Sequence, residues 1–169
     1  MDDLNAETGV ALRTLTMPSF MDNIAQRVGS IKENAMFFSP IDGDLELPSC
    51  ATRDIASVAV RWLLDDTWSG QEGVAVLGPE NISFSRMAEI MSEALGKRVR
   101  FQQTSFDAFK ERFQQFGFSE PIAQGITDMM YSKNYGLDLG VERTDENTTP
   151  TTFRRWCDDV LVPTLRVSN

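Results

Sequence analysis

A strand–helix–strand pattern in the middle of the chain limits the folds that this sequence can adopt. Residues 73–79 are almost wholly apolar and are bounded by glycine and proline, which is typical of a strand covered on both faces. A helix is predicted from a Ser83 cap to Leu95, and Gly96 is well placed to end it. Alternation over residues 99–103 predicts the next strand. Strands joined through a helix are expected to run parallel, so the pattern favours an α/β fold.

The other segments add one strand and several helices. The predicted elements are a strand at residues 10–17, a helix at 20–31, extended pieces on either side of a turn at 41–44, a helix at 55–64 capped by Thr52 or Asp54, and three C-terminal helices, the last opened by Thr149-Pro150 and ended by Pro163. Three strands are few for so much helix. We therefore predict an α/β protein with a short, mostly parallel sheet, flanking helices and a helical C-terminal third.

The charge balance argues against two classes of partner. Lys and Arg total 16 against 25 Asp and Glu, which gives a net charge of -9. Such a chain repels phosphate backbones and anionic lipid surfaces unless its basic residues cluster, and the densest basic group, residues 97–100, is short. The most apolar stretch, residues 55–64, is too short to span a bilayer. We expect neither a nucleic acid nor a membrane as partner.

The sequence contains no histidine, and this absence removes several kinds of chemistry. Nucleophilic triads that depend on histidine, imidazole general bases and histidine-ligated metals are all excluded, and no metal site is expected. The two cysteines, Cys50 and Cys157, lie outside any Cys-x-x-Cys spacing, and whether they form a disulfide stays open. Because the first residues do not resemble a signal peptide, we expect a cytoplasmic protein.

Four sequence motifs follow one another along residues 1–162. They are Thr-Gly-Val-Ala-Leu-Arg-Thr-Leu at 8–15 leading into Pro-Ser-Phe-Met-Asp-Asn at 18–23, Arg-Asp-Ile-Ala at 53–56, Leu-Gly-Pro-Glu-Asn-Ile-Ser at 77–83 with Ala-Leu-Gly-Lys-Arg-Val at 94–99, and Thr-Pro-Thr-Thr-Phe at 149–153. In this order they resemble the NmrA-like atypical short-chain dehydrogenases of the NAD(P)-binding Rossmann superfamily. The resemblance implies a partial Rossmann-like (NmrA-like) fold, with residues 1–169 as one domain on the substrate side.

The same resemblance bears on the cofactor. Members of this family begin with a dinucleotide-binding half, in which a Gly-x-x-Gly-x-x-Gly loop follows the first strand and holds the pyrophosphate. This sequence has no such loop, since Gly70 and Gly73 precede a predicted strand instead of following one. The resemblance thus implies a remnant of an NADP-dependent oxidoreductase or of a redox-sensing regulator, and this remnant is expected to bind a small molecule or a partner. NADP(H) is expected in full-length relatives, and no cofactor is expected for this chain alone. The dehydrogenase pair Tyr-x-x-x-Lys is also absent, because Tyr135 and Leu139 follow the two tyrosines at that spacing.

Two segments are the candidate binding sites. The resemblance places Pro18, Ser19, Phe20, Met21 and Asn23 near the nicotinamide and substrate, and ligands of open α/β sheets bind beyond the carboxyl ends of strands. The alternative is a plain strand-to-helix turn in which Pro18 sets the bend. Residues Pro48 and Ser49 are expected to line a cleft on the same side, or else to lead into a helix cap. The neighbouring Cys50 is either a reactive thiol at a helix N-terminus or a buried structural cysteine.

The remaining features each admit two readings. Strand 10–17 is expected to leave an open edge, which favours a homodimer or a partner chain. Aromatic residues at helical spacing (Phe106, Phe109, Phe113, Phe116) and the pair Met129-Met130 form either core or a lid over an apolar ligand of unknown identity. Two other classes of function stay open: a complete enzyme that uses carboxylates or Cys50 without a nucleotide, and a non-enzymatic interaction module that pairs with another chain.

Overall fold

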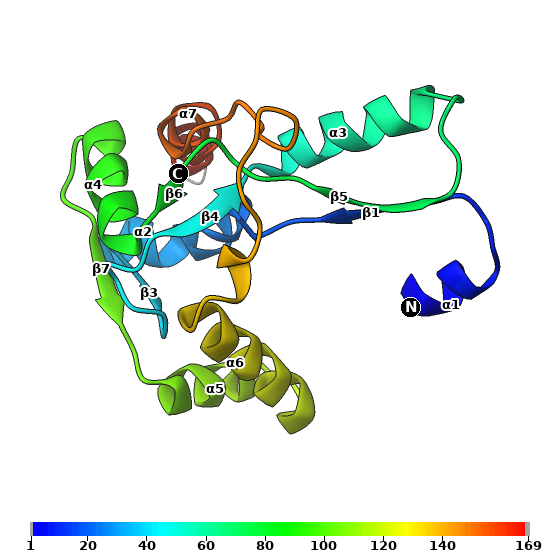
Figure 1. Ribbon diagram of the computed structural model, residues 1–169. Coiled ribbons are helices and arrows are strands. Elements are labelled where there is room, and N and C mark those ends of the chain that lie inside the picture. Colours follow the sequence, from blue (N-terminus) through cyan, green and yellow to red (C-terminus); the bar gives the residue numbers. More distant parts are fainter. Residues whose placement is uncertain (1, 168–169) are drawn as a thin grey trace.

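Helices and short strands alternate along the chain in the computed structural model, which describes residues 2–167 and confirms the α/β class (Figure 1). In chain order the elements are α1 (Asp2–Glu7), β1 (Leu12–Thr16), β2 (Ser19–Phe20), the 3₁₀ turns η1 (Met21–Asn23) and η2 (Ala25–Arg27), α2 (Val28–Asn34), β3 (Met36–Ser39), β4 (Leu47–Cys50), α3 (Thr52–Leu64), β5 (Gln71–Ala75), β6 (Asn81–Ile82), α4 (Phe84–Leu95), β7 (Arg100–Gln103), α5 (Phe106–Gln115), α6 (Glu120–Asn134), the 3₁₀ turn η3 (Leu137–Leu139), α7 (Phe153–Trp156), the π-helical turn η4 (Cys157–Leu161) and α8 (Val162–Val167).

The strands are distributed over small sheets. Strand β1 pairs in parallel with β5, β2 with β4, and β3 with β7, whereas β6 joins β4 in the antiparallel direction. The pairing is therefore mostly parallel, as predicted, because helices or long connections separate the partners along the chain. The β1–β5 ribbon extends out of the body of the molecule, and α5 and α6 form a hairpin that projects from it separately (Figure 1).

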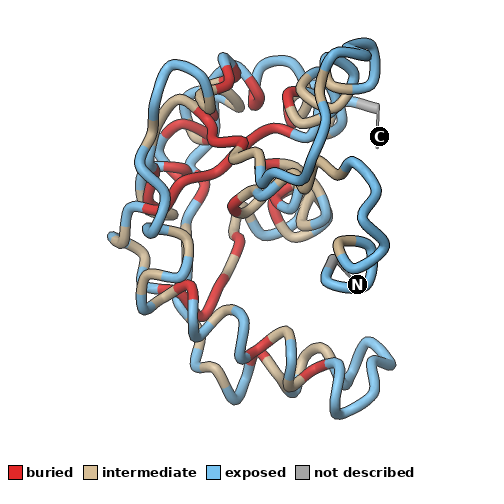
Figure 2. The backbone as a smooth tube through the Cα atoms, turned by 45° about the vertical axis from the view of Figure 1, so that its right-hand side comes forward, coloured by how far each residue is buried: buried red, intermediate tan, exposed pale blue. Residues whose placement is uncertain are grey.

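The hydrophobic core lies where η1, α2, β3 and β6 meet α4 and the C-terminal helices. Its largest fully buried side chains include Phe37, Met91, Phe153 and Trp156. The Phe37 ring also packs 5.4 Å from the ring of Phe101, centroid to centroid. Buried residues concentrate in this body, whereas the ribbon and the α5–α6 hairpin are largely exposed (Figure 2).

The predicted boundaries of α4 and the predicted start of α5 are confirmed. The Ser83 hydroxyl accepts a hydrogen bond from the Arg86 N–H at 3.1 Å, and Gly96 ends α4 with a φ of 63°. Likewise, the Ser105 hydroxyl accepts from the Ala108 N–H at 3.1 Å. These are local interactions: a hydroxyl satisfies an unpaired N–H of the first turn, and glycine adopts the left-handed conformation at little cost.

The prediction of one helix over residues 20–31 is wrong in its first half, and the observed helix ends three residues later, at Asn34. Ser19–Phe20 form β2, two 3₁₀ turns follow, and the α-helix begins only at Val28. Pairing with β4 explains the difference, because β2 exchanges backbone hydrogen bonds with a strand that lies about 30 residues away in the sequence. Helical periodicity of side chains cannot reveal such a partner.

The predicted cap of α3 is also wrong. The N-cap residue is Ala51, and its side chain makes no capping hydrogen bond. Instead, the Asp22 carboxylate accepts a hydrogen bond from the Thr52 N–H at 2.9 Å. The Asp22 carboxylate in η1 thus satisfies an unpaired N–H at the start of α3, a helix that lies about 30 residues later in the sequence. Its negative charge also interacts favourably with the positive end of the helix dipole.

Strand β5 is shorter and more exposed than the sequence suggests. It covers Gln71–Ala75, and its first three residues are exposed, so the prediction of a strand buried on both faces is wrong there. Burial begins at Val76, Leu77 and Gly78, where the chain enters the body of the molecule. The reason is the position of the β1–β5 ribbon, which extends beyond the core (Figure 1).

The C-terminal third is helical, as predicted, but it differs in two details. Pro163 does not end the last helix, because the π-helical turn η4 precedes it and α8 continues to Val167. A wider turn suits a proline, which has no N–H to donate and clashes with the carbonyl four residues earlier in a regular helix. On α6, Met129 is exposed and Met130 is half-buried, so the expected pair does not lie in the core. No helix within residues 2–167 has the length and apolar character needed to cross a bilayer.

Candidate functional site

The two segments predicted to bind a ligand lie side by side. Strands β2 and β4 run parallel, with Ser19 opposite Ser49 and Phe20 opposite Cys50. The segment 18–23 leaves β1 at its carboxyl end, and β4 presents its own carboxyl end at the start of α3. Sequence positions about 30 residues apart therefore meet at one edge, which is where ligands bind in open α/β sheets.

An enclosed cavity of about 70 Å³ lies at this edge, and we name it the strand-end cavity. Of the seven predicted residues, Ser19, Phe20, Asn23, Pro48 and Ser49 line it. The rest of the wall is mostly apolar, with Ile82, Phe84, Met87 and Met130 among its residues, and it also includes Arg27 and Ser39. The space is enough for a few water-sized groups, so it suits the polar end of a small molecule.

The other two predicted residues lie elsewhere. Pro18 lines a neighbouring cavity of about 160 Å³ together with Thr16, Met17 and Leu77. Met21 is 1 % exposed and packs in the hydrophobic core. Its thioether therefore contributes to stability, and the structure does not bring it to the wall of the strand-end cavity.

The Ser49 hydroxyl is the distinctive polar group of the cavity. Ser49 is 3 % exposed, and within residues 2–167 its Oγ finds no hydrogen-bond partner. Leaving a buried hydroxyl unsatisfied costs free energy of about 1–3 kcal/mol. A ligand oxygen or nitrogen that reached the Ser49 Oγ would remove that cost.

Gly78 explains how the wall behind Ser49 is built. A Cβ atom on Gly78 would lie 2.0 Å from the Ser49 carbonyl oxygen, so only glycine allows the two backbone segments to approach this closely. Arg143 fixes the segment by donating from Nε to the Gly78 carbonyl oxygen at 2.9 Å. Two residues later, Glu80 accepts a hydrogen bond from the Phe153 N–H at 3.2 Å. The Gly-Pro-Glu motif thus has a structural role beside the cavity.

Cys50 is not a reactive thiol. It is fully buried, and burial, followed by the charges of Asp54 and Asp22, raises its pKa to about 12. A thiol with such a pKa is protonated at neutral pH and is a poor nucleophile. Cys157 is likewise buried, and neither cysteine forms a disulfide. The structure therefore supports the structural alternative for Cys50 and settles the pairing that the sequence left open.

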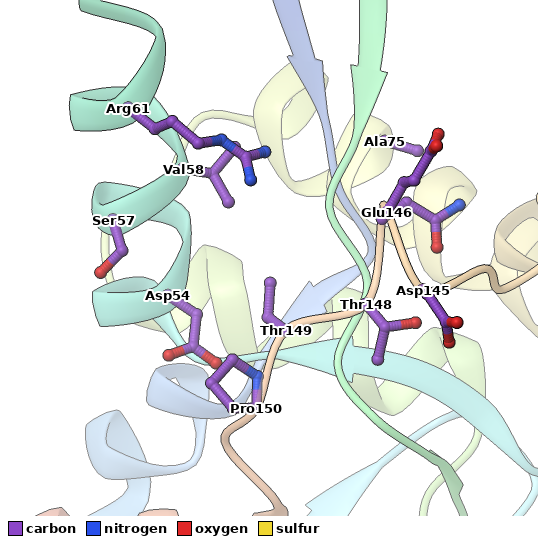
Figure 3. Close-up of a pocket in the computed structure, with 11 residues that line it drawn as sticks. Asp54, Ser57, Val58, Arg61, Ala75, Asp145, Glu146, Thr148, Thr149 and Pro150 are labelled. Atoms are coloured by element: carbon purple, nitrogen blue, oxygen red, sulfur yellow. The ribbon is translucent and has the colours of Figure 1, made fainter. Parts of the chain in front are cut away.

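A second, more open cavity was not predicted from the sequence. It has a volume of about 280 Å³ and lies between α3 and the loop at residues 145–150 (Figure 3). Arg61 reaches over it from α3, with Asp145 and Glu146 on the opposite side. At its base, Asp54 is already engaged, since its carboxylate accepts hydrogen bonds from the N–H and the hydroxyl of Thr151 at 2.9 and 2.8 Å. This buried carboxylate therefore fastens the loop to α3 and is not free for acid–base chemistry.

Sequence comparison identifies relatives among NAD(P)H-linked oxidoreductases. No protein-family model matches the chain. The NAD(P)H azoreductase of Xenophilus azovorans is 30% identical over 125 residues, covering 73% of this chain and 42% of the relative. A (4-alkanoyl-5-oxo-2,5-dihydrofuran-3-yl)methyl phosphate reductase of Streptomyces griseus is 27% identical over 155 residues, covering 89% and 53%.

Solved structures share the fold at low sequence identity. A nucleoside-diphosphate-sugar epimerase of Staphylococcus aureus superposes with a TM-score of 0.75 at 18% identity, covering 94% of this chain and 56% of the other. The NmrA negative transcriptional regulator, solved with NAD, gives 0.61 at 11% identity, covering 99% and 57%. This chain is an NmrA-like member of the NAD(P)-binding Rossmann superfamily. The NmrA-like chain spans about half the length of the relatives it matches.

Some features of the NmrA-like site had no sequence signal. Nothing in the sequence indicates that the Ser49 hydroxyl is unpartnered, because that depends on which groups surround it in three dimensions. Met130 and Ser39 also line the strand-end cavity; Met130 was expected in the core or in a lid, and Ser39 in an extended piece before the turn at 41–44. By contrast, residues 18–23 and 48–49 were found through their position after strands, a rule that depends only on topology.

Proposed function

We propose that this chain forms the substrate-side domain, residues 1–169, of an NAD(P)H-dependent reductase. The observation that carries the proposal is the buried, unpartnered Ser49 hydroxyl in a cavity lined by Ser19, Phe20 and Asn23. The cavity lies at the carboxyl ends of parallel strands, where substrates of α/β enzymes bind. Two of the relatives, an NAD(P)H azoreductase and a (4-alkanoyl-5-oxo-2,5-dihydrofuran-3-yl)methyl phosphate reductase, are reductases by name.

The proposed substrate is a small conjugated electron acceptor. Among the proteins of the same fold are an NADPH-dependent quinone oxidoreductase of Escherichia coli and a triphenylmethane reductase of Citrobacter sp. solved with NADP(H). Reduction of such an acceptor takes one hydride from the dihydronicotinamide and one proton from a polar group or solvent, leaving NAD(P)⁺ and the dihydro product. In this chain the Ser49 and Asn23 side chains would hydrogen-bond the acceptor heteroatom, and Phe20 would pack on its apolar part.

The dinucleotide itself is proposed to lie on a different segment or chain. The sequence has no glycine-rich loop after a strand, and backbone N–H groups of such a loop are what hold a pyrophosphate. We therefore expect titration of this chain with NADPH to leave the fluorescence of Trp62, Trp68 and Trp156 unchanged at micromolar concentrations. Saturation in that range would contradict the division of roles proposed here.

Substitution of Ser49 tests the substrate site. In Ser49→Ala, we expect 1,4-naphthoquinone to bind about three- to tenfold more weakly, because one neutral hydrogen bond is lost. Calorimetric titration of the folded chain measures the change. The matched control is Ser132→Ala, since Ser132 is exposed on α6 and donates only to the Asp128 carbonyl oxygen. Equal affinity of the wild type and Ser49→Ala would contradict a role for the hydroxyl.

A second candidate function, an interaction module, is favoured by the free edge of β1. Within residues 2–167, β1 pairs only with β5. The Leu12 N–H and the Thr16 carbonyl oxygen bond to the β5 side, so by alternation the N–H and C=O of Arg13 and Leu15 point to the open edge. An open edge favours pairing with a second copy or with a partner chain.

Sedimentation measurements test this second function. We expect the chain to form a dimer at micromolar concentration and Leu15→Pro to be monomeric, since proline removes an edge donor and obstructs pairing. A wild-type chain that stays monomeric up to about 100 μM would rule out strong pairing, because that limit corresponds to an association free energy weaker than about -5 kcal/mol.

A further inference from the structure

We propose that the groove between α2 and α5 binds an organic anion that carries an aromatic ring, such as an aromatic carboxylate or sulfonate. We name it the Arg27–Arg112 groove, after the two guanidinium groups that line it. Its volume is about 530 Å³, within the usual range for a small-molecule site. The groove shares Arg27 with the strand-end cavity, but Arg112 and the phenylalanines of the groove do not line that cavity. The inference therefore stands apart from the proposed reductase function, and it is tested without a nucleotide.

Aromatic side chains form much of the groove wall. They are Phe38 from β3 and Phe109, Phe113, Phe116 and Phe118 from α5 and the turn that follows it. The rings of Phe113 and Phe118 meet edge to face at an interplanar angle of 65°, with their centroids 5.3 Å apart. Phe116 and Phe118 are nevertheless 69% and 44% exposed, so apolar surface remains open to a ligand. Such a wall suits a flat aromatic ring, which gains from offset or edge-on contacts.

Two arginines bring positive charge to the same place. The Arg27 and Arg112 guanidinium carbons lie 5.2 and 3.7 Å from the centroid of the Phe38 ring. Arg27 is further positioned by a hydrogen bond from Nη1 to the Phe38 carbonyl oxygen at 2.6 Å. Both cations are therefore gathered around one aromatic side chain, and a single ligand in the groove can reach both.

Neither guanidinium has a counter-ion in the described part of the chain. The ion pairs between residues 2 and 167 involve other cations, although carboxylates outnumber basic residues by 25 to 16 over the sequence. Burial, and next the charge of Arg112, lowers the pKa of Arg27. Two like charges in a partly desolvated position repel one another, and an anion placed between them would relieve that repulsion.

Glu33 on α2 is the acidic residue among those that line the groove. It is exposed and forms no ion pair with either arginine. Its carboxylate opposes anion binding at longer range, where salt screens the interaction over about 8 Å at physiological ionic strength. The groove thus contains two arginines that attract an anion and one glutamate that weakly repels it. Removing an arginine charge should weaken anion binding, whereas removing the Glu33 charge should strengthen it.

The probe is 2-naphthalenesulfonate, and its uncharged counterpart is 2-naphthalenesulfonamide. Titration of the full chain, followed by NMR of the phenylalanine ring and arginine Nε–H resonances, should show saturable binding of the sulfonate. We expect the sulfonamide to bind about tenfold more weakly, since a charge-assisted hydrogen bond is about twice as strong as a neutral one. Equal affinity for the two compounds would overturn the proposal.

Variants separate the charge from the apolar wall. In Arg112→Gln we expect about a tenfold loss of affinity for the sulfonate and no change for the sulfonamide. The control Arg86→Gln, at an exposed arginine on α4 that pairs with Glu89, should bind like the wild type. In Glu33→Gln the sulfonate should bind about twofold more tightly. Unchanged affinity in Arg112→Gln, or weaker binding in Glu33→Gln, would overturn the proposal, and the Glu33 variant keeps it testable if Arg112→Gln fails to fold.

Discussion

Gly78→Ala is expected to lower the free energy of unfolding by about 3 kcal/mol or more, because overpacking against backbone cannot be relieved by a rotamer change. The added Cβ would lie 2.0 Å from the Ser49 carbonyl oxygen and 3.5 Å from the Cys50 Cα. Both atoms belong to β4, which pairs with β2 on one side and β6 on the other. Urea denaturation followed by circular dichroism measures the loss.

Gly125→Ala is the matched control, and it is expected to raise the free energy of unfolding instead of lowering it. Gly125 lies within α6, and a Cβ there would meet nothing within 4 Å. Alanine should therefore stabilise the chain by about 0.5–1 kcal/mol through its better helix propensity. A loss of less than about 1 kcal/mol in Gly78→Ala would mean that the wall behind Ser49 shifts easily. In that case the strand-end cavity would not be the rigid site on which the proposed function depends.

The parts of the fold that sequence reasoning predicted correctly are those that local chemistry decides. Ser83, Ser105 and Gly96 act within one helical turn, so each position can be recognised from its neighbours alone. The parallel pairing was also predictable, because helices between strands require crossover connections. These rules gave the fold class, the boundaries of α4 and the start of α5 without any knowledge of the core.

The errors come from contacts between distant segments. Residues 20–23 have a helical pattern of apolar residues, yet Phe20 pairs with β4 and is therefore in a strand. The Asp22 carboxylate accepts a hydrogen bond from the first turn of α3. Similarly, Met129 was expected in the core or in a lid, yet it is exposed, because α6 packs mainly against α5 in a hairpin outside the core. Periodicity indicates that one face is apolar, but it does not say which neighbour covers that face.

The candidate site likewise has features that the sequence predicted and features that it did not. Topology predicted that residues 18–23 and 48–49 would lie together, and β2–β4 pairing brings them to one cavity. The unsatisfied Ser49 hydroxyl and the two arginines around Phe38 depend on side-chain surroundings that no spacing encodes. The features that carry the proposals are therefore the ones that required coordinates.

Asp54→Ala is expected to be the second strongly destabilising change, with a loss of about 3 kcal/mol, because it leaves buried donors without their acceptor. Asp54 is 7% exposed, and its carboxylate accepts from both the N–H and the hydroxyl of Thr151, 97 residues away in the sequence. Thr151 in turn accepts a hydrogen bond from Arg53 Nε at 3.1 Å. Thermal denaturation of the variant measures the loss.

Comparison with an exposed carboxylate shows whether burial is the cause. Asp158 pairs with Arg154 on the surface, where an ion pair contributes about 0–1 kcal/mol, so Asp158→Ala should change stability little. A double-mutant cycle of Asp54→Ala with Thr151→Ala should give a coupling energy of about 1–2 kcal/mol, as for groups in one hydrogen-bond network. Additive effects would mean that the two residues act separately. The attachment of the 145–150 loop to α3, and with it the wall of the open cavity in Figure 3, would then depend on other contacts.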